Sequence, residues 1–301
     1  MARGLSRRGA LLGALALAGA CARPKGSPAD AGPASRVVSL GPATTEALFV
    51  IGAGPRVVGR SRFCDKPPEA RALPVIGGLT DPNLEAILAL RPDLVVGVRG
   101  PAGAELVAAL EGRGVRTYVP EAESKDQIVE LIHGLGARVG CAAGAAAAVA
   151  ELERTLAEVR ASVAGRPHPR VLLLFGRTPL VAAGSRSFPD EMLTLAGLGN
   201  ACVSRERYPT QEVERVLAMD PDVILDASME GDDAAYFSGA GWGRARAVRE
   251  RRVLRVTDVD VLRPGPSVAN GVATLARMVH GAGTRPGTGA GAGTAPGRGP
   301  T

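Results

Sequence analysis

Two stretches of the chain, LEAILALRPDLVV at residues 84–96 and VERVLAMDPDVIL at residues 213–225, follow one pattern. Each begins with a glutamate, Glu85 or Glu214, that stands seven residues before a Pro-Asp pair and three aliphatic residues. The pattern predicts a helix, a turn and then a buried strand. Two copies of such a unit predict two lobes built alike, with a cleft between them.

Two further pairs of segments extend the duplication. RVVSLG at 36–41 matches RVLLLFG at 170–176, and EALFVIGAG at 46–54 matches EMLTLAGLG at 191–199. A single match between short apolar segments is common. Three matches in the same order along the chain favour an internal duplication over coincidence.

Composition bounds the class of protein. The 301 residues leave room for two domains with their own cores, although only 3% of them are aromatic. The formal charge of +6 comes largely from arginines near the two ends of the chain, which are Arg3, Arg7, Arg8, Arg285 and Arg298. The charge is therefore no evidence for nucleic-acid binding.

The N-terminus is typical of an export signal. Ser-Arg-Arg at 6–8 resembles a Tat signal, and the apolar stretch that follows is too short to span a bilayer permanently. Residues 18–21, Ala-Gly-Ala-Cys, resemble a bacterial lipobox, although Ala18 stands where a leucine is usual. We expect a signal peptide over 1–21, lipidation of Cys21, and a periplasmic or cell-envelope location. The alternative is a plain signal peptide in which Cys21 is incidental.

Cys64, Cys141 and Cys202 remain after the signal. An odd number of cysteines in an oxidising compartment allows at most one disulfide within the chain, and the sequence leaves open whether one forms. No pair has the spacing of a metal site, so we expect small buried hydrophobic side chains and no metal.

Strands that alternate with helices predict parallel sheets covered on both faces. From Ala142 the chain is rich in Ala, Glu, Leu and Arg and has no proline until Pro167, which predicts one long helix of about 140–163. The alternative is two ordinary helices. The expected fold class is α/β, with two doubly wound lobes joined by one long α-helix. The expected segments are a linker (22–35), an N-terminal lobe (36–138), the connecting helix (139–165), a C-terminal lobe (166–281) and a disordered tail (282–301).

Several motifs resemble the substrate-binding proteins of bacterial ABC importers for cobalamin, haem and iron–siderophores. They are RVVSLGPATTEALFVIGAG, Cys64-Asp65 followed by Pro67-Pro68, LEAILALRPDLVV and RPGPSVANGVATLARM. The resemblance covers about residues 35–281. The segment LFGRTPLVAAGSRSFPDEMLTLAGLGNA is most similar to the cobalamin-binding branch. The resemblance implies a monomer that partners an ABC permease and its ATPase.

Ligands of parallel α/β lobes bind outside the carboxyl ends of the strands. A flat macrocycle needs broad apolar walls, and arginines there could pair with propionates or phosphate. For the aromatic residues the alternative is core packing, and it weighs most for Trp242. For the arginines the alternative is a solvated surface position. The expected ligand-binding residues are Pro42, Thr44, Phe63, Arg99, Phe175, Arg177, Phe188, Trp242, Asp260 and Arg263.

Glu85 and Glu214 each fall one turn into a predicted helix. An acid near a helix N-terminus stabilises the helix by about 0.3–1 kcal/mol, which explains either residue alone. The resemblance implies that both dock onto arginines of the permease. Glu212 is a rival for the second position, but the register of the repeat selects Glu214.

The expected function is capture of cobalamin or a related corrinoid between the lobes and its delivery to the permease. His133, His168 and His280 fall outside the predicted cleft loops, which places haem below cobalamin while Tyr208 and Tyr236 remain possible haem ligands. A haem or iron–siderophore carrier is the alternative of the same class. A membrane-tethered structural or sensor protein is the alternative of another class. The chain lacks the hydrolase, zinc-protease and phosphate-loop motifs, so we expect no enzyme and no cofactor.

Overall fold

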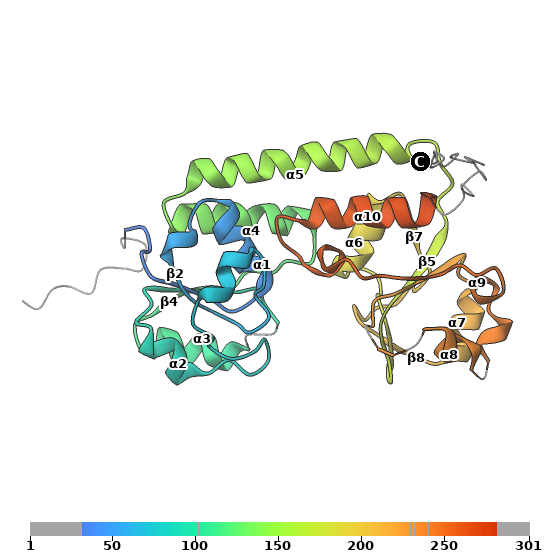
Figure 1. The fold of residues 1–301 in the computed structure, drawn as a ribbon, viewed down its shortest axis with the longest axis horizontal. Coiled ribbons are helices and arrows are strands. Elements are labelled where there is room, and N and C mark those ends of the chain that lie inside the picture. The colour runs from blue at the N-terminus through green and yellow to red at the C-terminus, as the bar shows by residue number, and fades with distance from the viewer. Residues whose placement is uncertain (1–31, 101–102, 229, 232, 240, 282–301) are drawn as a thin grey trace, which may run out of the picture. The chain divides into compact units, whose positions relative to one another are not determined.

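The computed structural model describes residues 32–281 apart from 101, 102, 229, 232 and 240 (Figure 1). The described residues belong to a single compact unit that starts at Gly32. The expected signal peptide, the lipidation site Cys21 and the expected tail lie outside the described residues.

The first sheet is entirely parallel and has the strand order β2-β1-β3-β4. Its strands are β1 (Val37–Ser39), β2 (Val57–Arg60), β3 (Leu94–Val96) and β4 (Arg116–Tyr118). Its helices are α1 (Pro42–Val50), α2 (Leu84–Ala89), α3 (Ala104–Glu111) and α4 (Lys125–Arg138), with short 3-10 turns η2 (Gly54–Arg56) and η3 (Pro68–Ala72). We call these elements the N-terminal lobe.

Both faces of the first sheet are buried, as the alternation of side chains along a strand requires. Val37 and Val96 pack on one face with residues of α1 and α4. Val38 and Val95 pack on the other face with residues of α2 and α3. Helices on both faces of a parallel sheet define the doubly wound arrangement that the sequence predicts.

The second sheet has the order β10-β9-β5-β6-β8, with β7 beside β5. Its strands are β5 (Arg170–Arg177), β6 (Leu180–Ala182), β7 (Gly199–Asn200), β8 (Thr210–Gln211), β9 (Val223–Asp226) and β10 (Val253–Arg255). Its helices are α6 (Phe188–Leu195), α7 (Val213–Met219), α8 (Asp233–Ser238), α9 (Arg246–Arg249) and α10 (Val268–Gly281), with turns η4 (Trp242–Arg244) and η5 (Val259–Leu262). These elements are the C-terminal lobe.

One edge of the second sheet departs from the parallel arrangement. Strands β7, β9 and β10 join the sheet in parallel, whereas β6 and β8 pair antiparallel. Only Thr178 and Pro179 separate β5 from β6, a length that allows an antiparallel hairpin and no crossover. No pattern in the sequence indicated this antiparallel edge, which leads to Tyr208 in the wall of the cleft.

Helix α5 (Ala142–Val163) follows α4 and leads to β5, so it connects the lobes (Figure 1). Its 22 residues rise by about 33 Å. It packs along α4 and α10, and its buried residues Leu152, Leu156, Val159 and Val163 recur at three- and four-residue spacing. The predicted fold class, two α/β lobes joined by one long helix, is confirmed.

The duplicated segment has the same place in both lobes. Each copy forms a helix, α2 or α7, followed by the strand next to the first strand of its lobe. The repeated aspartates tie these strands together: Asp93 accepts hydrogen bonds from the backbone of Ser35 and Arg36, and Asp222 accepts one from the backbone of Arg170. Partial burial acts to raise the pKa of both carboxyls, but these backbone donors leave it lowered.

Gly144 marks the closest approach of α5 to α1. A methyl group at this position would lie 2.2 Å from the carbonyl oxygen of Ile51. Helix propensity alone favours alanine over glycine by about 1 kcal/mol. We expect Gly144→Ala to lower the free energy of unfolding instead, by about 1–3 kcal/mol, because the helix must shift. Urea denaturation measures the sign.

Ala146→Ser, on the exposed side of α5, is the control and should change this free energy by no more than about 0.5 kcal/mol. Stabilisation by Gly144→Ala would contradict the tight contact.

Candidate functional site

A cavity of about 640 Å³ lies between the lobes. In the N-terminal lobe its wall comes from segments that follow β1, β2, β3 and β4, as expected for the carboxyl ends of parallel strands. The C-terminal lobe closes it with residues from α6, η5 and the loop before β8. The wall consists of Leu40, Gly41, Pro42, Ala43, Thr44, Phe63, Leu79, Val98, Arg99, Gly100, Ala122, Glu123, Phe188, Tyr208, Val259, Leu262, Arg263 and Pro264.

Six of the ten expected ligand-binding residues line this cavity, namely Pro42, Thr44, Phe63, Arg99, Phe188 and Arg263. Phe63 is 49% exposed, which is unusual for a large apolar side chain. Thr44 is buried, and its hydroxyl donates to the carbonyl of Gly41. The cavity therefore has broad apolar walls and few polar groups, as pockets for small molecules commonly do.

Phe175 and Trp242 lie outside the wall of this cavity. Phe175 contacts the ring of Tyr208 edge-on, with ring centroids 5.8 Å apart, and so stands behind the wall. Trp242 is 2% exposed and packs with Tyr236 and Phe237 in the core of the C-terminal lobe. Trp242 therefore packs in the core, as the alternative interpretation of the sequence allowed.

Arg177 and Asp260 also lie outside the wall of this cavity, and each forms an ion pair. Arg177 is buried, forms an ion pair with Asp226, and lies over the ring of Tyr236. Arg177 is the last residue of β5, where the strand continues into the β5–β6 hairpin, and its side chain is buried within the C-terminal lobe. Asp260 forms an ion pair with Lys66.

Tyr208 and Glu123 line the cavity, although neither was among the expected ligand-binding residues. Tyr208 precedes the helix that carries Glu214, which suggested a place away from the cleft. The antiparallel extension brings it back: the amide of Gly184 donates to the carbonyl of Arg207, and β8 pairs with β6. The short β5–β6 connection was the only signal that could have revealed this.

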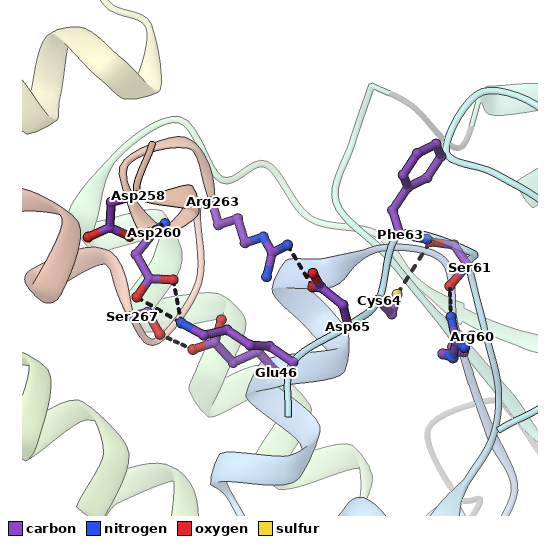
Figure 2. Close-up of polar contacts among 11 residues, drawn as sticks. Glu46, Arg60, Ser61, Phe63, Cys64, Asp65, Asp258, Asp260, Arg263 and Ser267 are labelled. Atoms are coloured by element: carbon purple, nitrogen blue, oxygen red, sulfur yellow. Dashed lines mark hydrogen bonds and ion pairs between the residues drawn. The ribbon is translucent and has the colours of Figure 1, made fainter. Parts of the chain in front are cut away.

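On one side of the cavity, three polar contacts join the lobes (Figure 2). Lys66 Nζ lies 2.6 Å from Asp260 Oδ1, and Arg263 Nη2 lies 2.7 Å from Asp65 Oδ1. The third contact is a hydrogen bond that Ser267 Oγ donates to Glu46 Oε1. On the other side, Glu123 accepts a hydrogen bond of 2.8 Å from the amide of Phe188.

Local structure fixes the groups that make these contacts. The buried Arg60 donates to the carbonyls of Ala70 and Ser61, and so holds the loop that carries Asp65 and Lys66 (Figure 2). Asp258 caps η5 by accepting from the amide of Asp260, and its other oxygen accepts from Thr274 of α10.

The electrostatics centre on Glu46. Burial raises the pKa of this carboxyl, the hydrogen bond from Ser267 opposes the rise, and Asp260 adds to it. Burial acts to lower the pKa of Lys66, but Asp260 leaves it raised. Glu46 Oε2 and Arg263 Nη1 are buried without a hydrogen-bond partner among the described residues.

Within the part of the chain that the structure describes, no cluster of three or more His, Cys, Asp or Glu could hold a metal ion. Cys64, Cys141 and Cys202 are free thiols there. None of the described helices is long and apolar enough to cross a membrane.

Two α/β lobes, one long connecting helix and a cleft between the lobes define a two-lobed substrate-binding protein. The family model described as "Periplasmic binding protein" matches residues 37–259. The chain belongs to this family, which implies a periplasmic location.

Relatives of known name and solved structures are also binding proteins. The chain is 36% identical over 200 residues to the vitamin B12-binding protein of Salmonella typhimurium, covering 66% of this chain and 74% of that protein. It is 29% identical over 247 residues to the vitamin B12-binding protein of Vibrio cholerae, covering 80% and 87%.

Among solved structures, the periplasmic haem-binding protein BhuT, in complex with two haems, superposes with a TM-score of 0.76 at 30% identity, covering 83% of this chain and 99% of that one. The periplasmic vitamin B12-binding protein BtuF of Vibrio cholerae gives 0.73 at 25% identity, covering 84% and 99%. Such homologues bind and release a ligand, so the expectation that the chain is no enzyme is confirmed. The bound molecule is a transported ligand and not a cofactor.

Glu46→Gln tests the cost of burying this carboxyl. Because the pKa of Glu46 is raised above its ordinary 4.5, the folded protein holds this proton more tightly than the unfolded chain does. The stability from this group is present below that value and is lost as the pH rises. We expect Glu46→Gln to raise Tm at pH 7, and the gain to shrink towards about pH 4. Scanning calorimetry at both pH values measures it.

Glu130→Gln, an exposed position on α4, serves as the control and should show little change at either pH. A lower Tm for Glu46→Gln at pH 7 would mean that Lys66 and Arg263 compensate the buried charge fully.

Proposed function

We propose that this protein captures cobalamin or a related corrinoid in the cleft between its lobes and delivers it to a membrane permease. The observation that carries the proposal is the cavity itself, which is walled by both lobes, is predominantly apolar, and belongs to a chain related to vitamin B12-binding proteins. A macrocycle would lie between Phe63 of one lobe and Phe188 and Leu262 of the other.

The few polar groups of the wall suit the edge of such a ligand. Arg99 and Arg263 can donate to amide or phosphate oxygens, whereas the buried hydroxyl of Thr44 already donates to the carbonyl of Gly41. A corrinoid with its nucleotide loop is larger than a flat porphyrin. In a cavity of about 640 Å³ we expect part of such a ligand to remain at the open mouth, near the exposed Phe63.

Haem is the second candidate, and Tyr208 is the observation that favours it. The phenol lines the cavity, and tyrosine is a known type of ligand for haem iron. Burial, together with the nearby carboxylate of Glu123, raises the pKa of this phenol, which opposes its use as an anionic ligand. This favours a corrinoid. A ferric siderophore is the remaining alternative of the class.

Delivery requires contact with a partner, since members of this family work with an ABC permease and its ATPase. Glu85 and Glu214 are exposed and occupy the first turns of α2 and α7, at the same position of the repeated unit. We propose that they dock onto the permease. We also propose that the protein is a monomer anchored to the membrane through a lipid on Cys21.

Phe63→Ala tests the cleft as the corrinoid site. The side chain is half exposed, so its removal should leave Tm unchanged while it weakens binding of cyanocobalamin by about tenfold, or ~1.4 kcal/mol. Isothermal titration calorimetry measures the affinity. Val203→Ala, at a residue 80% exposed and outside the cavity wall, is the matched control.

Lack of cyanocobalamin binding by the unmodified protein, with clear binding of haemin or a ferric siderophore, would sink the corrinoid proposal. Equal affinity of Phe63→Ala and the unmodified protein would mean that cyanocobalamin does not contact Phe63.

The double variant Glu85→Ala, Glu214→Ala tests docking. We expect it to abolish ligand uptake in cells that carry the cognate importer and to leave ligand affinity intact, because neither residue lines the cavity. Glu105→Ala, an exposed glutamate in the first turn of α3, is the control and should leave uptake unchanged. Lost affinity in the double variant would place the glutamates in the binding site.

A further inference from the structure

Among the described residues, the partners of the Glu123 carboxylate belong to the lobe opposite its own: Phe188, Tyr208 and Arg207. Its Oε2 accepts hydrogen bonds from the amide of Phe188, at 2.8 Å, and from the hydroxyl of Tyr208, at 3.4 Å. Arg207 Nη1 lies 3.7 Å from its Oε1. Its side chain is 23% exposed and forms part of the cavity wall.

Tyr208 is the group in this wall best suited to ligate a ferric ion. It could bind iron only as a phenolate, with its proton lost. Its hydroxyl donates to the Glu123 carboxylate, so deprotonation would break that hydrogen bond and place two negative oxygens side by side. The contact of Phe175 against the ring holds the phenol in this position.

We propose that Glu123 is a specificity-determining residue, which keeps Tyr208 a hydrogen-bond donor and thereby selects a corrinoid over a haem. The inference rests on the proposed function and deepens it. Cyanocobalamin presents a cobalt whose axial positions are filled and a rim of neutral amides, so it needs no protein ligand and can donate to a carboxylate. Haem presents an open iron and two carboxylates, and Glu123 disfavours both.

The two arginines of the wall do not neutralise Glu123, because each is paired with another carboxylate. Arg263 lies 2.7 Å from Asp65, and Arg99 lies 3.2 Å from Glu121. Neither cation is an ion-pair partner of Glu123 among the described residues. The end of the cavity that holds Tyr208 is therefore where an acid excludes haem.

Glu123→Gln removes the charge and keeps the size. With its oxygen at the Oε2 position, the amide can still accept from Phe188 and from the Tyr208 hydroxyl, but it no longer places a full negative charge beside a phenolate at Tyr208. We expect the affinity for haemin to rise at least about tenfold relative to that for cyanocobalamin. Absorption spectroscopy of bound ferric haem should show a phenolate-to-iron band that the unmodified protein lacks.

Two variants make the test specific. Glu130→Gln removes an equal charge from an exposed position on α4 that lies outside the wall, and should leave haemin affinity unchanged. The double variant Glu123→Gln, Tyr208→Phe should lose both the gain in affinity and the phenolate band.

Unchanged or weaker haemin binding by Glu123→Gln, an equal gain in Glu130→Gln, or a gain that survives Tyr208→Phe would overturn the inference. These outcomes are separate from failure of the proposed function, which is judged by cyanocobalamin binding to the unmodified protein.

Discussion

Polar side chains that reach across the cleft fix the separation of the two lobes, and the cavity exists only because of that separation. The ion pairs Lys66–Asp260 and Asp65–Arg263, with the hydrogen bond between Ser267 and Glu46, join the lobes on one side. Partly exposed pairs each contribute about 1 kcal/mol or less. Their effect lies in geometry, since each pair is satisfied at one spacing of the lobes. Helix α5, packed along α4 and α10, sets the same spacing from outside.

The contacts between the lobes also include a free-energy cost, which involves a residue of the cavity wall. Glu46 and Arg263 each keep a buried polar atom without a partner among the described residues, and such atoms are expensive to bury. Arg263 is at once a wall residue of the cavity and a member of the contacts between the lobes. A ligand that touches Arg263 therefore acts on the contacts that hold the cleft, which links occupancy to the arrangement of the lobes.

The sequence predicted the scaffold well because repetition and periodicity reflect backbone structure. The repeated Pro-Asp pairs lie where two lobes built alike require them, with each aspartate bound to the backbone of the neighbouring strand. The rule for the carboxyl ends of parallel strands brought Pro42, Thr44 and Arg99 to the cavity. It failed for Arg177, because β5 continues into an antiparallel hairpin, and it passed over Tyr208, which that hairpin returns to the cleft. Side-chain direction in Trp242 depends on tertiary packing, which no local pattern encodes.

The central claim is that the lobes are held at nearly their final spacing before a ligand arrives. Nitroxide labels on cysteines introduced at Val50 and Val203, one exposed position in each lobe, report this spacing by pulsed electron–electron double resonance. Replacement of Cys21 and Cys141 by serine leaves Cys64 and Cys202 as buried native thiols. The account predicts one narrow distance distribution that shifts by less than about 2 Å when cyanocobalamin is added in excess. A broad distribution without ligand that collapses to a much shorter distance on binding would contradict it.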